Sequence, residues 1–174
     1  NSPTLAESQE GIFFAVFPKI KGRLLNELDD SQVRQMGRML ARLHNVGETL
    51  GPSHRPTLSV KTFLDEPVHT LLSSNFFDPN SQSRFESVCA QLREKIAPKL
   101  EKTKCIRVHG DCHLGNTLWS QKDGPFLLDF DDMRLGPVVQ DIWMVLRGRE
   151  ESAVKQRQEM LDAYEIFRPF PWEQ

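Results

Sequence analysis

The sequence predicts an α+β fold in which a mainly helical body carries a small β-structure. Apolar residues recur at helical spacing over 33–44 and 85–96. Short segments typical of brief strands, rich in apolar, β-branched and aromatic residues, lie at 105–108, 117–119 and 126–128. A length of 174 residues with 39% hydrophobic side chains suits one ordinary domain or a large piece of a bigger one.

The first part of the chain is expected to contain one strand and one long helix. Residues 11–17 form a continuous run of apolar, aromatic and β-branched side chains that stops at Pro18, which predicts a strand buried on both faces. A polar connection over 19–26 follows. The Asp29-Asp30-Ser31 triplet offers N-cap side chains for a helix that is expected to stop at Gly47.

The middle of the chain predicts two further helices. A short one is expected over 60–72, interrupted by Pro67, and a loop over 75–83 follows it. The amphipathic pattern over 85–96 predicts a second helix that ends before Pro98, because a residue preceding proline disfavours helical backbone.

The last third of the chain combines the small β-structure with two helices. A strand over 105–108 precedes a loop, and 117–119 with 126–128 predict a hairpin. Helices are expected over 141–146 and 154–167.

Composition excludes several classes of protein. The net charge of −2 argues against a nucleic-acid-binding module, which would usually be basic. No apolar run approaches the roughly 18 residues of a membrane span. Three cysteines without a framework spacing, and no visible secretory signal, predict a reduced, cytoplasmic protein, expected to be a monomer. The missing initiator Met and the aromatic end predict a fragment of a longer polypeptide.

One arrangement of polar residues carries chemistry. Asp111 lies in a loop, Asn116 follows five residues later, and Asp129 ends an apolar strand. Transfer of a γ-phosphoryl group needs one carboxylate to accept the proton of the attacking hydroxyl and an Asp/Asn pair to hold Mg²⁺. The spacing matches the kinase signature of H-R-D-x-x-x-x-N followed by D-F-G. His109, Asp111 and Asn116 occupy the H, D and N positions of the first motif, and Asp129-Phe130-Asp131 stands in the place of D-F-G.

Simpler interpretations remain open for each of these residues. Asp111 could cap a turn, and Asn116 could be a left-handed turn residue. Asp129 is harder to explain without a cation, because an ionised carboxylate is costly at the end of an apolar strand. Asp131 could touch a second Mg²⁺ or simply face solvent, and Asp141 could be a helix cap.

Other chemistries fit the sequence less well. Cys105, His109, Cys112 and His113 do not have the spacing of a structural zinc site. Cys112 lacks the partners of a nucleophilic triad. His44, on an apolar helix face, is more typical of a hydrogen-bonded core histidine.

These motifs resemble the protein-kinase-like superfamily, in the branch of aminoglycoside phosphotransferases and choline kinases, and within it bacterial stress-response protein kinases. In that branch the catalytic loop typically has the sequence pattern H-G-D-x-x-x-x-N, as it does here. The similarity covers nearly the whole chain. It depends on these stretches: 14–18, 40–44, 54–57, 109–119 and 136–144.

The resemblance implies a role for each site residue. Asp111 would be the proton acceptor, and Asn116 and Asp129 would bind Mg²⁺. His109 and Asp131 would support the site, and Asp141 would be a buried support for the catalytic-loop backbone.

The resemblance also implies a division of the chain. Residues 1–22 would end the small N-lobe and form the hinge, 23–174 would be the helical C-lobe, and most of the N-lobe would be absent. Backbone groups of the hinge would face the nucleotide of ATP, the cosubstrate; these are Val16, Phe17, Pro18 and Lys19. No glycine-rich phosphate loop and no lysine-bearing strand precedes Phe13.

Four functions remain open. The first is an ATP-dependent protein serine/threonine kinase, and the second is a kinase of a small hydroxyl substrate such as choline, homoserine or an aminoglycoside. The third is a C-lobe fragment that transfers nothing. The fourth is a Mg²⁺-dependent hydrolase in which Asp129 and Asp131 form an aspartate pair.

Overall fold

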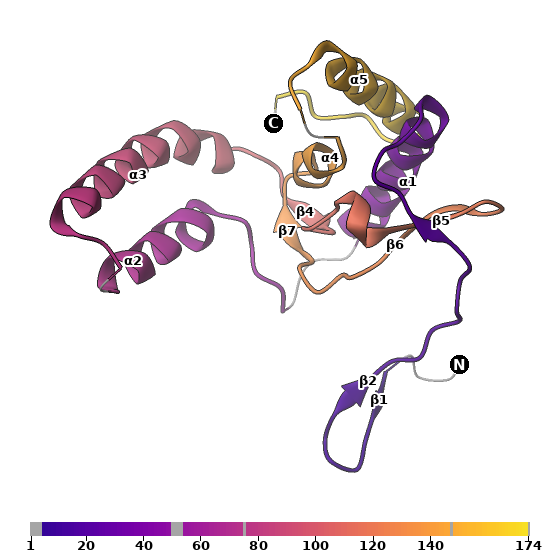
Figure 1. The fold of residues 1–174 in the computed structure, drawn as a ribbon, viewed down its shortest axis with the longest axis horizontal. Helices are drawn as coiled ribbons and strands as arrows, with labels where there is room; N and C mark the ends of the chain where they lie inside the picture. Colours follow the sequence, from indigo (N-terminus) through magenta and orange to yellow (C-terminus); the bar gives the residue numbers. More distant parts are fainter. Residues whose placement is uncertain (1–4, 50–53, 75, 147, 174) are drawn as a thin grey trace.

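The computed structural model describes residues 5–49, 54–74, 76–146 and 148–173. Figure 1 shows a helical body, a helical arm that projects from it, and a small hairpin near the N-terminus that stands away from both. The elements of the body and hairpin are β1 (Ala6–Glu7), β2 (Phe13–Phe14), β3 (Arg23–Leu24), α1 (Asp30–Thr49), β4 (Ile106–Val108), β5 (Thr117–Ser120), β6 (Gly124–Leu127), β7 (Arg134–Gly136), α4 (Val139–Val145) and α5 (Glu151–Glu165). The arm contains a π-helical turn (Lys61–Asp65), α2 (Glu66–Ser73) and α3 (Pro79–Leu100).

Helix α1 begins where the sequence predicts. The Asp29 carboxylate accepts a hydrogen bond from the Gln32 N–H at 2.9 Å, and the Gln32 side chain accepts one from the Asp29 N–H at 2.9 Å. This reciprocal capping box satisfies backbone donors that the first turn leaves free. The prediction that the helix stops at Gly47 is wrong, because α1 continues through that residue to Thr49.

Two glycines allow α1 to approach its neighbours closely. A Cβ atom at Gly37 would lie 2.1 Å from the backbone oxygen of Met160 in α5, and one at Gly47 would lie 2.2 Å from that of Arg107 in β4. Gly47 therefore serves contact with the strand and does not end the helix. The main core lies between these elements, and its largest fully buried side chains include Tyr164, Met36 and Leu40.

Within the described residues, the β-structure consists of three small sheets. Strands β5 and β6 form the predicted hairpin, with Thr117 opposite Leu127, and β3 adds to it antiparallel, with Arg23 opposite Trp119. The polar connection expected over 19–26 therefore contains a strand. The predicted strand over 105–108 is present as β4, which pairs with β7 through Arg107 and Leu135.

The expected buried strand over 11–17 is wrong. Only Phe13 and Phe14 are extended in a ladder, paired with β1, and both rings are exposed. Val16 is 83% and Phe17 79% exposed. Among the described residues, β1 is the only strand beside this segment, so its apolar faces have no second sheet neighbour or layer to pack against. Residues 1–4, at the start of the expected segment 1–22, lie outside the described residues.

The arm differs from its prediction at three points. Pro67 lies in the first turn of α2, where its missing N–H is tolerated, and the π-helical turn precedes it. Helix α3 begins at Pro79, inside the expected loop, because Asp78 caps it by accepting from Asn80 N–H at 3.0 Å. It also passes Pro98 and ends two residues later at Leu100, where the N–H of the C-cap residue Glu101 donates to the Ala97 oxygen.

Among the described residues, no helix combines the length and the apolar character that crossing a bilayer requires.

Candidate active site

The loop that carries Asp111 lies between β4 and the short 3₁₀ turn Leu114–Asn116. Its backbone turns at Gly110, which has a φ of +89°. A Cβ atom there would lie 2.2 Å from the backbone oxygen of Asp132. Only glycine fits both the left-handed conformation and this close approach, so Gly110 fixes where the next residue, Asp111, emerges.

Asp141 holds this loop from below. Its side chain is fully buried in α4, and one oxygen accepts from the His109 N–H at 2.8 Å while the other accepts from the Gly110 N–H at 2.9 Å. The Gln140 amide adds a hydrogen bond to the Gly110 oxygen at 3.3 Å. The interpretation of Asp141 as a plain helix cap is therefore not supported, because the carboxylate is directed at the loop.

Asp111 and Asn116 meet at the surface of the site. The Asn116 Nδ2 donates to the Asp111 backbone oxygen at 3.0 Å and to its Oδ2 at 3.1 Å. The His113 Nε2 lies 3.3 Å from the same Oδ2. These neighbours orient the Asp111 side chain. Because it is still 34% exposed, a substrate can reach it.

The segment that carries Asp129 is joined to this loop through Leu128. The Leu128 N–H donates to the Asn116 oxygen at 2.8 Å, and the Leu128 oxygen accepts from the His109 Nε2 at 2.8 Å. The His109 ring also contacts the Phe130 ring, with centroids 4.5 Å apart. The structure thus brings the predicted residues of both motifs together.

Asp129 itself differs from its expected environment. It is exposed, so the desolvation argument for a cation at this position fails. Its backbone supplies another signal: Asp129 has a φ of +58° and is the one non-glycine residue at positive φ within the described part of the chain. Aspartate tolerates the left-handed region better than most residues, and such outliers gather at functional sites.

The following acidic residues are held by arginines. The Arg55 guanidinium donates to the Asp131 backbone oxygen at 2.6 Å. The Arg134 guanidinium pairs with the Asp132 carboxylate at 2.7 Å and so neutralises its charge. Asp131 is exposed.

The predicted hinge residues lie apart from these loops. Val16, Phe17, Pro18 and Lys19 are exposed, in the connection between β2 and β3. Across the described ranges, no hydrogen bond or ion pair joins them to the loops of Asp111 or Asp129. The hydrogen bonds and ion pairs of the described residues therefore do not connect the predicted hinge to these two loops.

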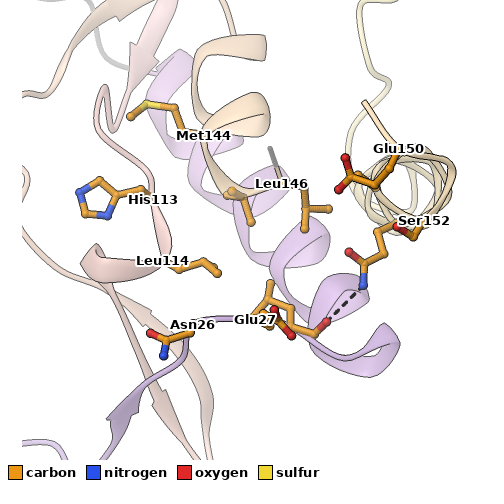
Figure 2. Close-up of a pocket in the computed structure, with 12 residues that line it drawn as sticks. Asn26, Glu27, His113, Leu114, Met144, Leu146, Glu150 and Ser152 are labelled. Carbon is orange, nitrogen blue, oxygen red and sulfur yellow. Dashed lines mark hydrogen bonds between the residues drawn. The ribbon is translucent and has the colours of Figure 1, made fainter. Parts of the chain in front are cut away.

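A cavity of about 740 Å³ opens beside His113. Figure 2 shows His113 and Leu114 on one side, Met144 and Leu146 of the α4 region on another, and Glu150 and Ser152 from the start of α5 opposite. Asn26 and Glu27 close it from the segment before α1, where the Gln156 amide donates to the Leu28 oxygen at 3.2 Å. The lining is mixed, with two carboxylates.

Cys112, next to Asp111, is fully buried. Burial, together with the nearby Asp141 and Asp111 charges, raises the pKa of its thiol well above the ordinary value. A buried thiol of this kind is a poor nucleophile.

Sequence reasoning missed two residues of the site. His113 contacts Asp111 and also lines the cavity, yet only its adjacency in the motif could have indicated it. Arg55 reaches Asp131 from 76 positions away. Its segment was noted for its resemblance alone, and no local pattern predicts that contact.

Among the described residues, no group of three or more His, Cys, Asp or Glu side chains clusters as a metal cage. Asn116 uses its Nδ2 on Asp111, which leaves its Oδ1 as a candidate ligand. One amide oxygen and one carboxylate, Asp129, fit Mg²⁺, which commonly takes its other ligands from phosphates and water.

Comparison with known proteins places the chain among phosphotransferases. The family described as "Phosphotransferase enzyme family" matches residues 2–174. "Stress response kinase A" of Escherichia coli (strain K12) is 36% identical over 171 residues, covering 98% of this chain and 51% of that protein. "Serine/threonine protein kinase RdoA" of Salmonella typhimurium is 33% identical over 177 residues, with the same coverages of 98% and 51%. The chain thus spans about half the length of these relatives.

Solved structures show the same fold at low identity. An amicoumacin kinase, hAmiN, in complex with AMP-PNP, Ca²⁺ and Ami has a TM-score of 0.68 at 17% identity, covering 95% of this chain and 53% of that one. A microcompartment-associated aminopropanol kinase has a TM-score of 0.64 at 16% identity, covering 98% and 60%. The described elements are therefore part of a kinase-like fold.

Proposed function

The chain belongs to the phosphotransferase enzyme family, and from this premise we propose that the protein containing it is an ATP-dependent kinase that phosphorylates a hydroxyl group. The observation that carries the proposal is the Asp111 carboxylate, oriented by Asn116 at 3.1 Å and partly exposed beside a cavity. Phosphoryl transfer relies mainly on positioning and electrostatics, and this arrangement supplies a positioned base.

Asp111 would act on the acceptor. As the acceptor oxygen forms its bond to the γ-phosphorus of ATP, the bond from that phosphorus to the β,γ-bridging oxygen breaks, and the acceptor proton passes to Asp111. ADP leaves, and no covalent bond to the protein forms. Asn116 and His113 keep Oδ2 in place during this step.

Asn116 and Asp129 would hold Mg²⁺, which neutralises phosphate charge when it is bound. The link through Leu128 supports this pairing, because the N–H of Leu128, the residue before Asp129, donates to the backbone oxygen of Asn116. The positive φ of Asp129 sets the direction of its side chain.

We place the nucleotide base at the exposed connection before β3. Residues 1–22 would belong to the small lobe and hinge, and 23–174 to the C-lobe. Support comes from the exposed apolar side chains at Val16 and Phe17, which have no partner layer within the described residues.

A protein serine or threonine hydroxyl is the first candidate acceptor. The support is the 36% identity over 98% of this chain to a relative named as a stress response kinase, and the name of RdoA as a serine/threonine protein kinase.

A small cationic amino alcohol is the second candidate, because the cavity beside His113 carries two carboxylates. Glu27 and Glu150 line it from opposite sides, and Met144 and Leu146 add apolar surface. This lining suits a small molecule with an ammonium group and a short carbon skeleton.

Two variants of the protein that contains this chain test the mechanism. Asp111→Ala is expected to lower turnover by about 10²–10⁴-fold, the usual contribution of a general base, while MgATP still binds. Asp129→Ala should lose metal-dependent nucleotide binding. Asp123→Ala, in the exposed β5–β6 turn, is the matched control. Near-normal turnover of Asp111→Ala would refute the assignment.

Two further measurements separate the alternatives. Acid quenching with radiolabelled ATP should leave no phosphoenzyme, whereas an aspartate-pair hydrolase would form one. Transfer to a casein acceptor and to choline, homoserine and kanamycin distinguishes the two acceptors. If the acceptor is cationic, Glu150→Gln should raise its KM and leave transfer to casein unchanged. No transfer to any acceptor, with no stabilisation by MgATP, would favour a non-catalytic domain.

A further inference from the structure

A buried series of hydrogen-bonded polar side chains continues from the catalytic loop into the helical core. Asp141, His44 and Tyr164 are each fully buried, and His109 is 1% exposed. His44 lies in α1 and Tyr164 in α5, so the series joins elements that are 97 and 120 residues apart in sequence. None of these links takes part in the proton transfer described above.

The hydrogen-bond directions in this series follow from chemistry. The Asp141 carboxylate can only accept, so His44 Nε2, at 3.0 Å from Oδ2, is the donor. In the neutral ring the other nitrogen, Nδ1, is then an acceptor, and the Tyr164 hydroxyl donates to it at 2.9 Å. One tautomer of His44 satisfies both neighbours.

Tyr164 is suited to be the donor at the end of this series of hydrogen bonds. Burial raises the pKa of its hydroxyl well above the ordinary value, opposed in part by the neighbouring Arg168. The hydroxyl therefore keeps its proton over the whole physiological range.

The hydrogen bonds to His44 and to the catalytic loop share one atom, Oδ2 of Asp141. Asp141 Oδ2 accepts from His44 Nε2 and also from the His109 N–H at 2.8 Å, while Oδ1 accepts from the Gly110 N–H at 2.9 Å. Three donors therefore compensate the buried charge. Rotation of this carboxylate would move the backbone immediately before Asp111.

The surrounding packing fixes the helices that carry these hydrogen-bonded side chains. Gly37 brings α1 against Met160 of α5, and Gly47 brings it against Arg107 of β4, next to the catalytic loop. His44 lies one heptad after Gly37 and therefore on the same face of α1. Its ring is held between α4 and α5 by bonds at both nitrogens.

From this geometry we propose that His44 and Tyr164 are positioning residues for Asp111, acting through Asp141 on the His109–Gly110 backbone. The proposal rests on the proposed kinase function for its consequence on rate. Its structural content stands independently, since the hydrogen bonds to His109 and Gly110 are measurable in the chain itself.

The first test uses amide hydrogen exchange in this chain. Tyr164→Phe removes only the hydroxyl, and we expect exchange of the His109 and Gly110 amides to accelerate about tenfold. Met160→Leu, equally buried on the same helix and outside the series of hydrogen bonds, is the matched control. Equal exchange in the two variants would overturn the proposal.

The histidine is tested by rescue. His44→Gln offers an amide nitrogen that can donate to Asp141, so the two amides should stay within about threefold of their native exchange. His44→Leu cannot donate and should lose the protection. Equal protection in both variants would overturn the proposal; if the leucine variant does not fold, Tyr164→Phe decides alone.

The second test measures catalysis in the protein that contains this chain. Tyr164→Phe should lower kcat about tenfold and leave the KM for ATP within twofold, because the base moves while the nucleotide site does not. A native kcat combined with faster amide exchange would overturn positioning of Asp111. If Asp111→Ala retained turnover, the kinase function would fail instead, and the exchange result would be unaffected.

Discussion

The buried Asp141 carboxylate gives the sharpest prediction for stability. Asp141→Asn changes one oxygen into an amide nitrogen with little change in volume. If the remaining oxygen faces the Gly110 N–H, the new NH₂ group faces the His109 N–H and the His44 ring. His44 can exchange tautomers and accept from the amide, but the backbone N–H of His109 cannot become an acceptor.

The cost follows from the bonds that change. An unsatisfied buried donor at His109 costs about 1–3 kcal/mol. The bond from Gly110 loses its charge assistance, and charge-assisted bonds are roughly twice as strong as neutral ones, so about 1 kcal/mol more is lost. We therefore expect the free energy of unfolding to fall by about 2–4 kcal/mol.

Urea unfolding followed by circular dichroism measures this change. Asp132→Asn is the control, because the Asp132 carboxylate pairs with Arg134 but is exposed, and exposed pairs contribute at most about 1 kcal/mol. The slope with urea should stay constant, so that the midpoint reports stability. A loss below 1 kcal/mol for Asp141→Asn would refute the view that this carboxylate holds the loop.

Three further outcomes are expected. Burial and nearby carboxylates raise the pKa of Cys112, so a thiol reagent should label Cys89 and Cys105 in the folded chain and reach Cys112 only in urea; Cys112→Ser identifies the slow site. Lys104 and then Arg168 lower the pKa of Glu48 from 4.5 to about 2, so its contribution is present above pH 4.5 and disappears as the pH falls toward 2. The Tm gap between the native chain and Glu48→Gln should close over that window and shrink in high salt, and a constant gap would contradict the pairing. Gly37→Ala gains helix propensity of about 1 kcal/mol but places a Cβ 2.1 Å from the Met160 oxygen. Overpacking of 1–3 kcal/mol should win, giving an earlier urea midpoint; an increase in stability would show that α1 and α5 separate freely.

Local patterns determined much of this protein. The capping residue Asp29, the strand over 105–108 and the hairpin from Thr117 were predicted because caps, short strands and tight turns depend on neighbours in sequence. The loop motif with Asp111 and Asn116 was also visible, since the two residues are only five positions apart and bond directly.

Burial depended on partners that no local pattern shows. The apolar run over 11–17 has the composition of a core strand, yet it is exposed because β1 is its only neighbouring strand among the described residues. Asp129 was expected in an apolar setting, and the structure places it at the surface with a left-handed backbone. Gly47 has the appearance of a helix stop, but contact with Arg107 explains it.

The sequence alone therefore predicted the fold class and the residues that we propose for the site, because both predictions depend on spacing and periodicity. Only the tertiary structure decided what supports them. Asp141, His44 and Tyr164 come from three helices that are adjacent only after packing, and their hydrogen bonds exist because a buried charge needs donors from several elements at once.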